Sequence, residues 1–264
     1  MMKEYSTLQF TQDGPVAKIL FNRPEILNRM DDVSTAELVD VIERMRRPGD
    51  ARVLLFASTG KAFSAGGDLE EVRRLATDKD RRFDAWDAGR RLIYGMMEIP
   101  VPTVMALQGD AYGLASSIVL SGDIIVASKN VRIGDPHVRV GLSAGDGGCL
   151  LWPAAFGMTK AKRHLLTGDP IGAEEAYRLG GVTDLVDTPE EVLPLAERLA
   201  AQITELPPMA VQLTKRALNH AMHKQAVDVF EFSLALEQYG MLSEDLLEAI
   251  DAFKNKRPPV YRNR

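Results

Sequence analysis

The chain contains 264 residues, carries a formal net charge of −5 and has one cysteine, Cys149. A chain of this length can form one large domain, or a domain with an appendage, whose core needs no disulfide bonds. A lone cysteine excludes an internal disulfide and fits a reducing compartment. The sequence has no basic tract typical of nucleic-acid binding, no apolar run near the ~18 residues of a membrane span, and no apolar signal core in residues 1–5. We therefore expect a soluble, cytoplasmic protein.

Strand and helix signals alternate along most of the chain. Apolar or alternating runs predict strands at 7–11, 16–21, 53–57, 103–107, 124–127, 131–133 and 182–186. The turn signal Asp13-Gly14 separates the first two and predicts a hairpin. Asp31 or Asp32 is placed to cap a helix before the third strand. The strongly charged segment 69–98 predicts a solvated helical face.

The last part of the chain has a different pattern. From Pro189 onward no strand signal remains, and apolar spacing predicts helices at 190–203, 208–223, 227–239 and 244–254. Alternating strands and helices before this point favour an α/β core. We therefore divide the chain into a core, 1–195, and a C-terminal helical region, 196–264.

Two glycine-containing loops each follow a predicted strand and precede a predicted helix. The first, 61–69, contains Gly66-Gly67, and the second, 108–115, contains Gly113-Leu114. Unpaired N–H groups at a helix start attract an anionic oxygen, and glycine lets a ligand approach closely. Two such amides directed at one point would form an oxyanion hole. The simpler alternative for each loop is a tight turn that leads into a helix.

Five short segments occur in order across nearly the whole chain. They are Asn22–Glu25 with Asn28, Phe63–Leu69, Gln108–Ala115 with Asp123, Thr167–Asp169 with 173–176 and 180–186, and Ala252–Pro259. Each is a weak signal alone, but together they resemble the crotonase superfamily, the enoyl-CoA hydratase/isomerase relatives. The resemblance implies a spiral of β-β-α units. It also implies a C-terminal helical region that mediates assembly into a homotrimer or a homohexamer.

The same resemblance implies an acyl-CoA thioester substrate, with coenzyme A as part of the substrate and no separate cofactor. The thioester oxygen would lie between the amides of Gly67 and Leu114. Leu114 stands where relatives usually carry glycine, which keeps the N–H and narrows the pocket. The other residues that the resemblance assigns to substrate or CoA binding are Arg23, Ala65, Gly66, Asp68, Leu69, Ser117, Phe253 and Lys256, the last two reaching the CoA of a neighbouring subunit.

The sequence departs from the family pattern at two catalytic positions. Hydratases of this family use two glutamates to position water and move protons, and here Ser117 and His137 stand in their places. His137 and Asp146 lie nine residues apart, on loops that this fold would bring to one pocket. An imidazole can accept or donate a proton near neutral pH, and a neighbouring carboxylate can fix its tautomer. The simpler alternatives are a turn histidine bonded to a backbone carbonyl and an aspartate helix cap.

Several functions remain open at this level. The His137/Asp146 pair resembles a superfamily branch that hydrolyses carbon–carbon bonds of β-diketones, such as 6-oxocamphor hydrolase. Serine, histidine and aspartate in this chain order could also form a nucleophilic triad, although Ser117 more simply fills a helix start. A third alternative is a non-catalytic member that binds acyl-CoA. No Cys/His cluster has metal-ligand spacing, so no metal is expected. We favour an acyl-CoA enzyme, because Phe253 and Lys256 fit a CoA site.

Overall fold

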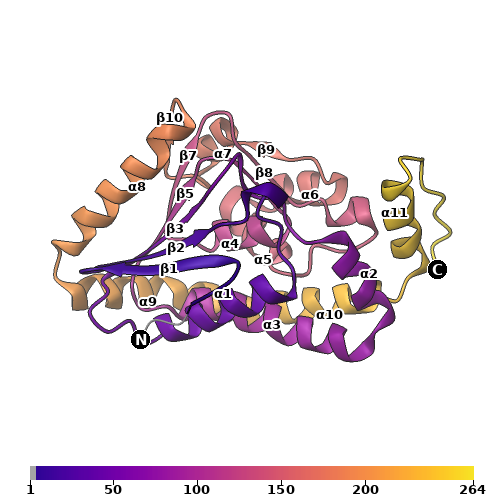
Figure 1. The fold of residues 1–264 in the computed structure, drawn as a ribbon, viewed down its shortest axis with the longest axis horizontal. Helices are drawn as coiled ribbons and strands as arrows, with labels where there is room; N and C mark the ends of the chain where they lie inside the picture. The colour runs from indigo at the N-terminus through magenta and orange to yellow at the C-terminus, as the bar shows by residue number, and fades with distance from the viewer. Residues whose placement is uncertain (1–3) are drawn as a thin grey trace.

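The computed structural model describes residues 4–264, which form two β-sheets surrounded by helices (Figure 1). The strands are β1 (Leu8–Asp13), β2 (Val16–Phe21), β3 (Val53–Ser58), β4 (Ala62–Ser64), β5 (Thr103–Leu107), β6 (Asp110–Tyr112), β7 (Ile124–Ser128), β8 (Arg132–Gly134), β9 (Ile171–Gly172) and β10 (Asp184–Val186). The α-helices are α1 (Asp32–Met45), α2 (Leu69–Thr77), α3 (Lys79–Glu98), α4 (Leu114–Leu120), α5 (Gly148–Phe156), α6 (Met158–Thr167), α7 (Ala173–Leu179), α8 (Pro189–Thr204), α9 (Pro208–Gln225), α10 (Glu231–Gly240) and α11 (Glu244–Lys254). Two short 3-10 helices, η1 (Pro24–Ile26) and η2 (His137–Val140), and one π-helical segment, η3 (Ala226–Phe230), complete the described elements.

The larger sheet has the strand order β1-β2-β3-β5-β7-β10. The hairpin β1–β2 is antiparallel, as the Asp13-Gly14 turn predicts, and the remaining neighbours are parallel. Strand β3 is buried along 53–57, which explains its uninterrupted apolar sequence. One face of this sheet packs against α8, through Val192 and Ala196 among others, and the opposite face meets the main core (Figure 1).

The smaller sheet has the strand order β4-β6-β8-β9. Between β3 and β8 the chain passes alternately from the larger sheet to the smaller one and then through helix, in the order β3-β4-α2-α3, β5-β6-α4 and β7-β8. This repeated β-β-α unit confirms the predicted spiral. Strands β4 and β6 lie in the two segments that we predicted as loops. They are only three residues long and carry too little pattern to be recognised in sequence.

The charged segment 69–98 forms two helices instead of one exposed face. Asp78 ends α2 and caps α3, where its carboxylate accepts hydrogen bonds from the amides of Asp80 and Arg81. The last turns of α3 are buried, including Leu92 and Met96. The prediction of a solvated face is therefore wrong for the C-terminal half of α3, because this half packs into the main core.

The chain after Pro189 is helical, as predicted. The predicted division between residues 195 and 196 falls inside α8, and whether the two parts are separate units remains a prediction. Asp31, the first of the two predicted caps, caps α1 and forms a reciprocal pair with Ser34. Among residues 4–264, no helix combines the length and the apolar character needed to cross a membrane.

Candidate active site

The predicted site residues follow three adjacent parallel strands. Strand β4 pairs with β6, and β6 pairs with β8, in parallel registers. Parallel strands send their carboxyl ends to the same edge of a sheet, where the following loops meet and ligands commonly bind. The loops after these strands carry Gly67, Leu114 and His137 in turn. The fold therefore brings the two predicted amides and the predicted imidazole to one edge.

Gly66 and Gly67 shape the first loop. Gly66 has a φ of +85°, and an added Cβ would lie 2.7 Å from the carbonyl oxygen of Tyr112 on the second loop. Gly67 forms a parallel bridge with Met30, in which Met30 donates to the Gly66 oxygen at 2.8 Å and Asp68 donates to the Met30 oxygen at 2.9 Å. Because successive residues of an extended chain point to opposite sides, the Gly67 N–H faces away from Met30. No atom lies within 4 Å of where a Gly67 Cβ would be, so a ligand has room to approach.

Leu114 begins α4 on the second loop. Its N–H is at the first helical position and therefore has no acceptor within its own helix. The preceding residue, Gly113, has a φ of +56°. A Cβ added there would lie 3.6 Å from Cε1 of His137 and 3.9 Å from the Cα of Gly66. The two glycine loops and the imidazole are thus in contact at this point.

His137 begins η2 and lies between two carboxylates. Its Nδ1 forms a short hydrogen bond with Asp135, and its Nε2 is 3.4 Å from Oδ2 of Asp146. Burial alone would lower the pKa of His137, but Asp135 and Asp146 outweigh this and hold it well above its ordinary value. The two carboxylates therefore favour the protonated imidazolium. The structure brings the predicted pair together, but Asp135, which sequence reasoning missed, is the carboxylate on Nδ1.

Asp146 and Ser117 are also neighbours. The Ser117 hydroxyl is 3.5 Å from Oδ1 of Asp146, a long hydrogen bond. Gly147, with a φ of +125°, is the residue that caps α5, so the interpretation of Asp146 as the helix cap is wrong. A Cβ added to Gly147 would lie 3.0 Å from the Ser117 hydroxyl. The Ser117 side chain on α4 therefore packs beside both Asp146 and Gly147.

A fourth ionisable residue, Glu237 on α10, was also missed from the sequence. Its Oε1 is 3.9 Å from Nε2 of His137, and the residue is 5% exposed. Burial, reinforced by Asp146, raises the pKa of Glu237 to about 8. The available signal was periodicity, because Glu237 occupies the same buried face of α10 as Leu234 and Met241. An acid at a core position of an amphipathic helix is rare without a specific role.

Asp135, His137 and Asp146 offer donor atoms that all lie within 4.8 Å of one another. The sequence predicted that His137 and Asp146 would lie together, but it did not predict that Asp135 would join them. Both imidazole nitrogens already face carboxylates. In this arrangement the three side chains form an ion-paired triad centred on the imidazole.

The family model described as enoyl-CoA hydratase/isomerase matches residues 11–264. The chain belongs to the enoyl-CoA hydratase/isomerase family. It is 30% identical to the short-chain-enoyl-CoA hydratase of Clostridium acetobutylicum, over 96% of this chain and 97% of the relative. Family membership identifies the chain, at a coarse level, as a lyase or isomerase of the crotonase superfamily.

Solved structures agree with this assignment. An enoyl-CoA hydratase/isomerase from Mycobacterium paratuberculosis superposes with a TM-score of 0.90 at 34% identity, and the match covers 94% of this chain and 99% of the other. A β-diketone hydrolase from Anabaena, bound to (S)-3-oxocyclohexyl acetic acid, superposes with a TM-score of 0.84 at 25% identity, covering 90% and 95% of the two chains. The crotonase-type spiral is therefore shared with enzymes of two reaction types.

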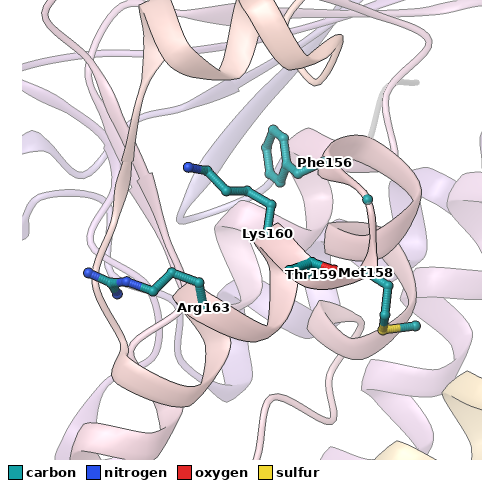
Figure 2. A pocket seen from close by; sticks show the side chains of 6 residues that line it. Phe156, Met158, Thr159, Lys160 and Arg163 are labelled. Carbon is teal, nitrogen blue, oxygen red and sulfur yellow. The ribbon is translucent and has the colours of Figure 1, made fainter.

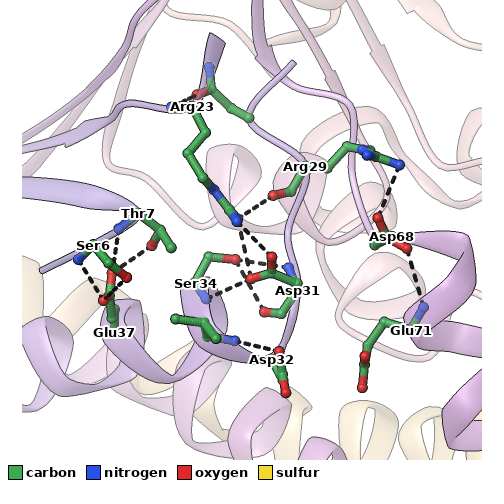
Figure 3. Close-up of polar contacts among 12 residues, drawn as sticks. Ser6, Thr7, Arg23, Arg29, Asp31, Asp32, Ser34, Glu37, Asp68 and Glu71 are labelled. Carbon is green, nitrogen blue, oxygen red and sulfur yellow. Dashed lines mark hydrogen bonds and ion pairs between the residues drawn. The ribbon is translucent and has the colours of Figure 1, made fainter. Parts of the chain in front are cut away.

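Arg23, in the first of the five family segments, and Asp68, in the first glycine loop, both form ion pairs with residues that lie between them in the sequence. Arg23 forms an ion pair with Asp31 at 2.6 Å and donates to the carbonyl of Arg29 at 2.7 Å (Figure 3). Asp68 caps α2 and forms an ion pair with Arg29 at 3.0 Å. The guanidinium of Arg23 is thus occupied in holding the chain before α1. Its predicted contact with CoA remains a prediction, as do those of Ala65, Asp68 and Leu69.

The two C-terminal residues assigned to CoA lie on or after α11. Phe253 is 69% exposed, and Lys256 follows the helix with a φ of +51°. Helix α11 lies beside α2 of the same chain, where Lys254 pairs with Glu70 at 3.0 Å (Figure 1). The C-terminal end of α11 is therefore close to the start of α2, the helix that follows the first glycine loop, within one subunit. A contact with the CoA of a neighbouring subunit remains a prediction.

A hollow opens at the junction of α5 and α6 (Figure 2). Phe156, Met158, Lys160 and Arg163 are among the residues that line it. Both of its cations are paired, Lys160 with Glu175 and Arg163 with Asp169. This hollow contains none of the residues of the His137 cluster and does not have their chemistry.

Proposed function

We propose that this chain acts on an acyl-CoA thioester through an enolate whose oxygen binds to the amides of Gly67 and Leu114. The observation that carries this proposal is the contact between the two glycine loops at Gly66 and Gly113. In the transition state the thioester oxygen gains negative charge, and preorganised N–H donors stabilise that charge. Losing one such donor typically costs about 3–4 kcal/mol of activation free energy.

His137 and Asp146 would move the protons in place of the two missing glutamates. Since the pKa of His137 is raised, the imidazolium starts as the proton donor and the Asp146 carboxylate starts as the acceptor. In hydration, Asp146 takes a proton from water as the water oxygen adds to the β-carbon. His137 then gives its Nε2 proton to the α-carbon, and the enolate collapses to the thioester. Asp146 returns its proton to His137 across 3.4 Å, which restores the starting state.

The test is a substrate panel: crotonyl-CoA, longer enoyl-CoAs and a cyclic β-diketone, each with wild type and with His137→Ala. We expect the wild type to turn over an enoyl-CoA, which is measured by the decrease in ultraviolet absorbance of the enoyl thioester. In His137→Ala the turnover rate should be lower by about 10²–10⁴-fold. Undiminished hydration by the variant would remove His137 from the mechanism. Binding of acyl-CoA without any turnover, unchanged in the variant, would instead support a non-catalytic member.

A second candidate is carbon–carbon bond hydrolysis of a β-diketone. It is favoured by the similarity to the Anabaena hydrolase and by a histidine–carboxylate cluster in place of two glutamates. Asp146 would take a proton from water as the water oxygen adds to one carbonyl carbon. The carbon–carbon bond would then break, and the leaving enolate, bound to the same two amides, would take a proton from His137 to give the ketone. Turnover of the cyclic β-diketone, with no turnover of any enoyl-CoA, would select this candidate.

We also propose that copies of the chain associate through the C-terminal helices into a trimer or a dimer of trimers. Exposed apolar side chains on α10, including Phe232, Leu236 and Tyr239, support an interface there. Light scattering on the purified protein tests this directly. A monomer at micromolar concentration would exclude the assembly, and with it the predicted contact of Phe253 and Lys256 with a neighbouring CoA.

A further inference from the structure

Helix α10 packs closely against the loop that carries Asp146. Ser233 donates a hydrogen bond to the carbonyl of Gly145 at 3.2 Å. A Cβ added to Gly145 would lie 2.5 Å from Cβ of Glu237 and 2.7 Å from its Oε2. A side chain at position 145 would therefore displace Glu237. The loop is shaped to admit this carboxyl group beside His137.

Glu237 lacks the partners that a structural carboxylate has. Its Oε2 is fully buried with no hydrogen-bond partner among the described residues, and its Oε1 faces His137 from 3.9 Å. Glu71, another buried glutamate, pairs with Arg74 at 2.9 Å and lies near Arg81. An ionised carboxylate without a donor is costly to bury, whereas a neutral carboxyl group is much less so.

The charges around Glu237 also favour its protonated form. The ionisable groups that face it are Asp135 and His137 before and on η2, Asp146 before α5, and Cys149 on α5. Asp135, Asp146 and Glu237 give this buried cluster three carboxyl groups for one imidazole. Ionising Glu237 would therefore add a negative charge where the carboxyl groups already outnumber the cation. Its raised pKa, about 8, agrees with this count.

We propose that Glu237 is a positioning residue that stores one proton in the active site and thereby keeps His137 able to donate to substrate. This inference rests on the proposed roles of His137 and Asp146. When Glu237 loses its proton, the additional negative charge near Nε2 holds the imidazolium proton more tightly. Transfer of that proton to the α-carbon then slows. Activity should therefore decrease as pH rises through the pKa of Glu237.

The test compares wild type with Glu237→Gln, which keeps the shape and the neutral state of the protonated acid. Above pH 8 the wild-type rate should fall about tenfold per pH unit, as expected for one titrating group. In the variant the rate should change less than about twofold between pH 7 and 9. Glu231→Gln, which changes a half-buried glutamate of α10 that pairs with Arg90 and not with the His137 cluster, is the matched control and should titrate like wild type. An unchanged alkaline limb in active Glu237→Gln would overturn the proposal.

A second measurement separates this proposal from the proposed function, because it needs no substrate. A carboxyl group whose folded pKa exceeds its unfolded value makes the folded state less stable as pH rises between the two values. Wild type should lose thermal stability relative to Glu237→Gln between about pH 4.5 and 8, and the difference should then level off. A stability difference that does not depend on pH would overturn the proposal that Glu237 stores a proton. This test can be read even if no substrate is turned over.

Discussion

Two ionic groups that each contain a buried charged side chain differ in how their charges balance. Lys215 on α9 pairs with Asp123 at 2.6 Å and donates to the carbonyl of Val101 at 2.9 Å. The Asp123 carboxylate also accepts from the amide and the hydroxyl of Thr103. Here one anion meets one cation, and each has additional hydrogen-bond partners. This pair fastens α9 to the larger sheet.

The cluster around His137 has one imidazole for three carboxyl groups, Asp135, Asp146 and Glu237. Two of its buried oxygens, one on Asp135 and one on Glu237, have no partner among the described residues. Its carboxyl groups outnumber its cation, and not all of its buried oxygens are hydrogen-bonded. The difference suggests that a balanced pair is structural, whereas an unbalanced buried cluster beside the two glycine loops is functional.

The largest expected effect comes from removing the proton acceptor of the unbalanced cluster. Asp146→Asn should lower turnover about 10²–10⁴-fold, because an amide cannot take a proton from water. Asp187→Asn, which removes a 74% exposed surface carboxylate paired with Lys129, is the control and should leave turnover unchanged. Steady-state kinetics on the best substrate of the panel measures both. Full activity in Asp146→Asn would show that the cluster is not catalytic.

The next effect tests the contact between the two glycine loops. Gly66→Ala would place a methyl group 2.7 Å from the Tyr112 carbonyl and push the loops apart. We expect turnover to fall about 10²–10³-fold, as for the loss of one oxyanion-hole donor. Gly180→Ala is matched in backbone strain, with a φ of +88°, but meets no atom within 4 Å. Equal losses in the two variants would attribute the effect to strain alone.

The balanced pair should affect stability and not catalysis. Lys215→Met leaves the Asp123 carboxylate without its cation, and because this carboxylate is 25% exposed to water the free energy of unfolding should fall by about 1–2 kcal/mol. The rate constant of the folded enzyme should stay the same. Lys18→Met breaks the exposed pair with Glu197 and should cost less than about 1 kcal/mol. Urea unfolding compares the two, and a catalytic defect in folded Lys215→Met would contradict the distinction drawn above.

The smallest effect is expected at Ser117. Its contact with Asp146 is long, at 3.5 Å, and a weak hydrogen bond of this kind contributes about 1 kcal/mol or less. Ser117→Ala should therefore change turnover less than about fivefold. A nucleophilic serine would instead make this variant inactive. Mass spectrometry after rapid quenching provides an independent check, because it would detect an acyl-enzyme on Ser117.

Local sequence determined much of this protein. The hairpin turn, the buried strand β3, the Asp31 cap and the two glycine loops follow from turn chemistry, apolar periodicity and the special conformations of glycine, which act over a few residues. The order of the five family segments identified the fold. The same reasoning predicted that His137 and Asp146 would share a pocket.

Tertiary structure alone decided the rest. Strands β4 and β6 are too short to be recognised, yet their pairing determines that the two glycine loops meet. Asp135 was passed over as the partner of Nδ1, because sequence distance does not say which carboxylate a ring nitrogen will face. Glu237 reaches the cluster from a helix far along the chain, packed against Gly145. Proton-holding groups depend on which charges are buried together, and only long-range packing sets that.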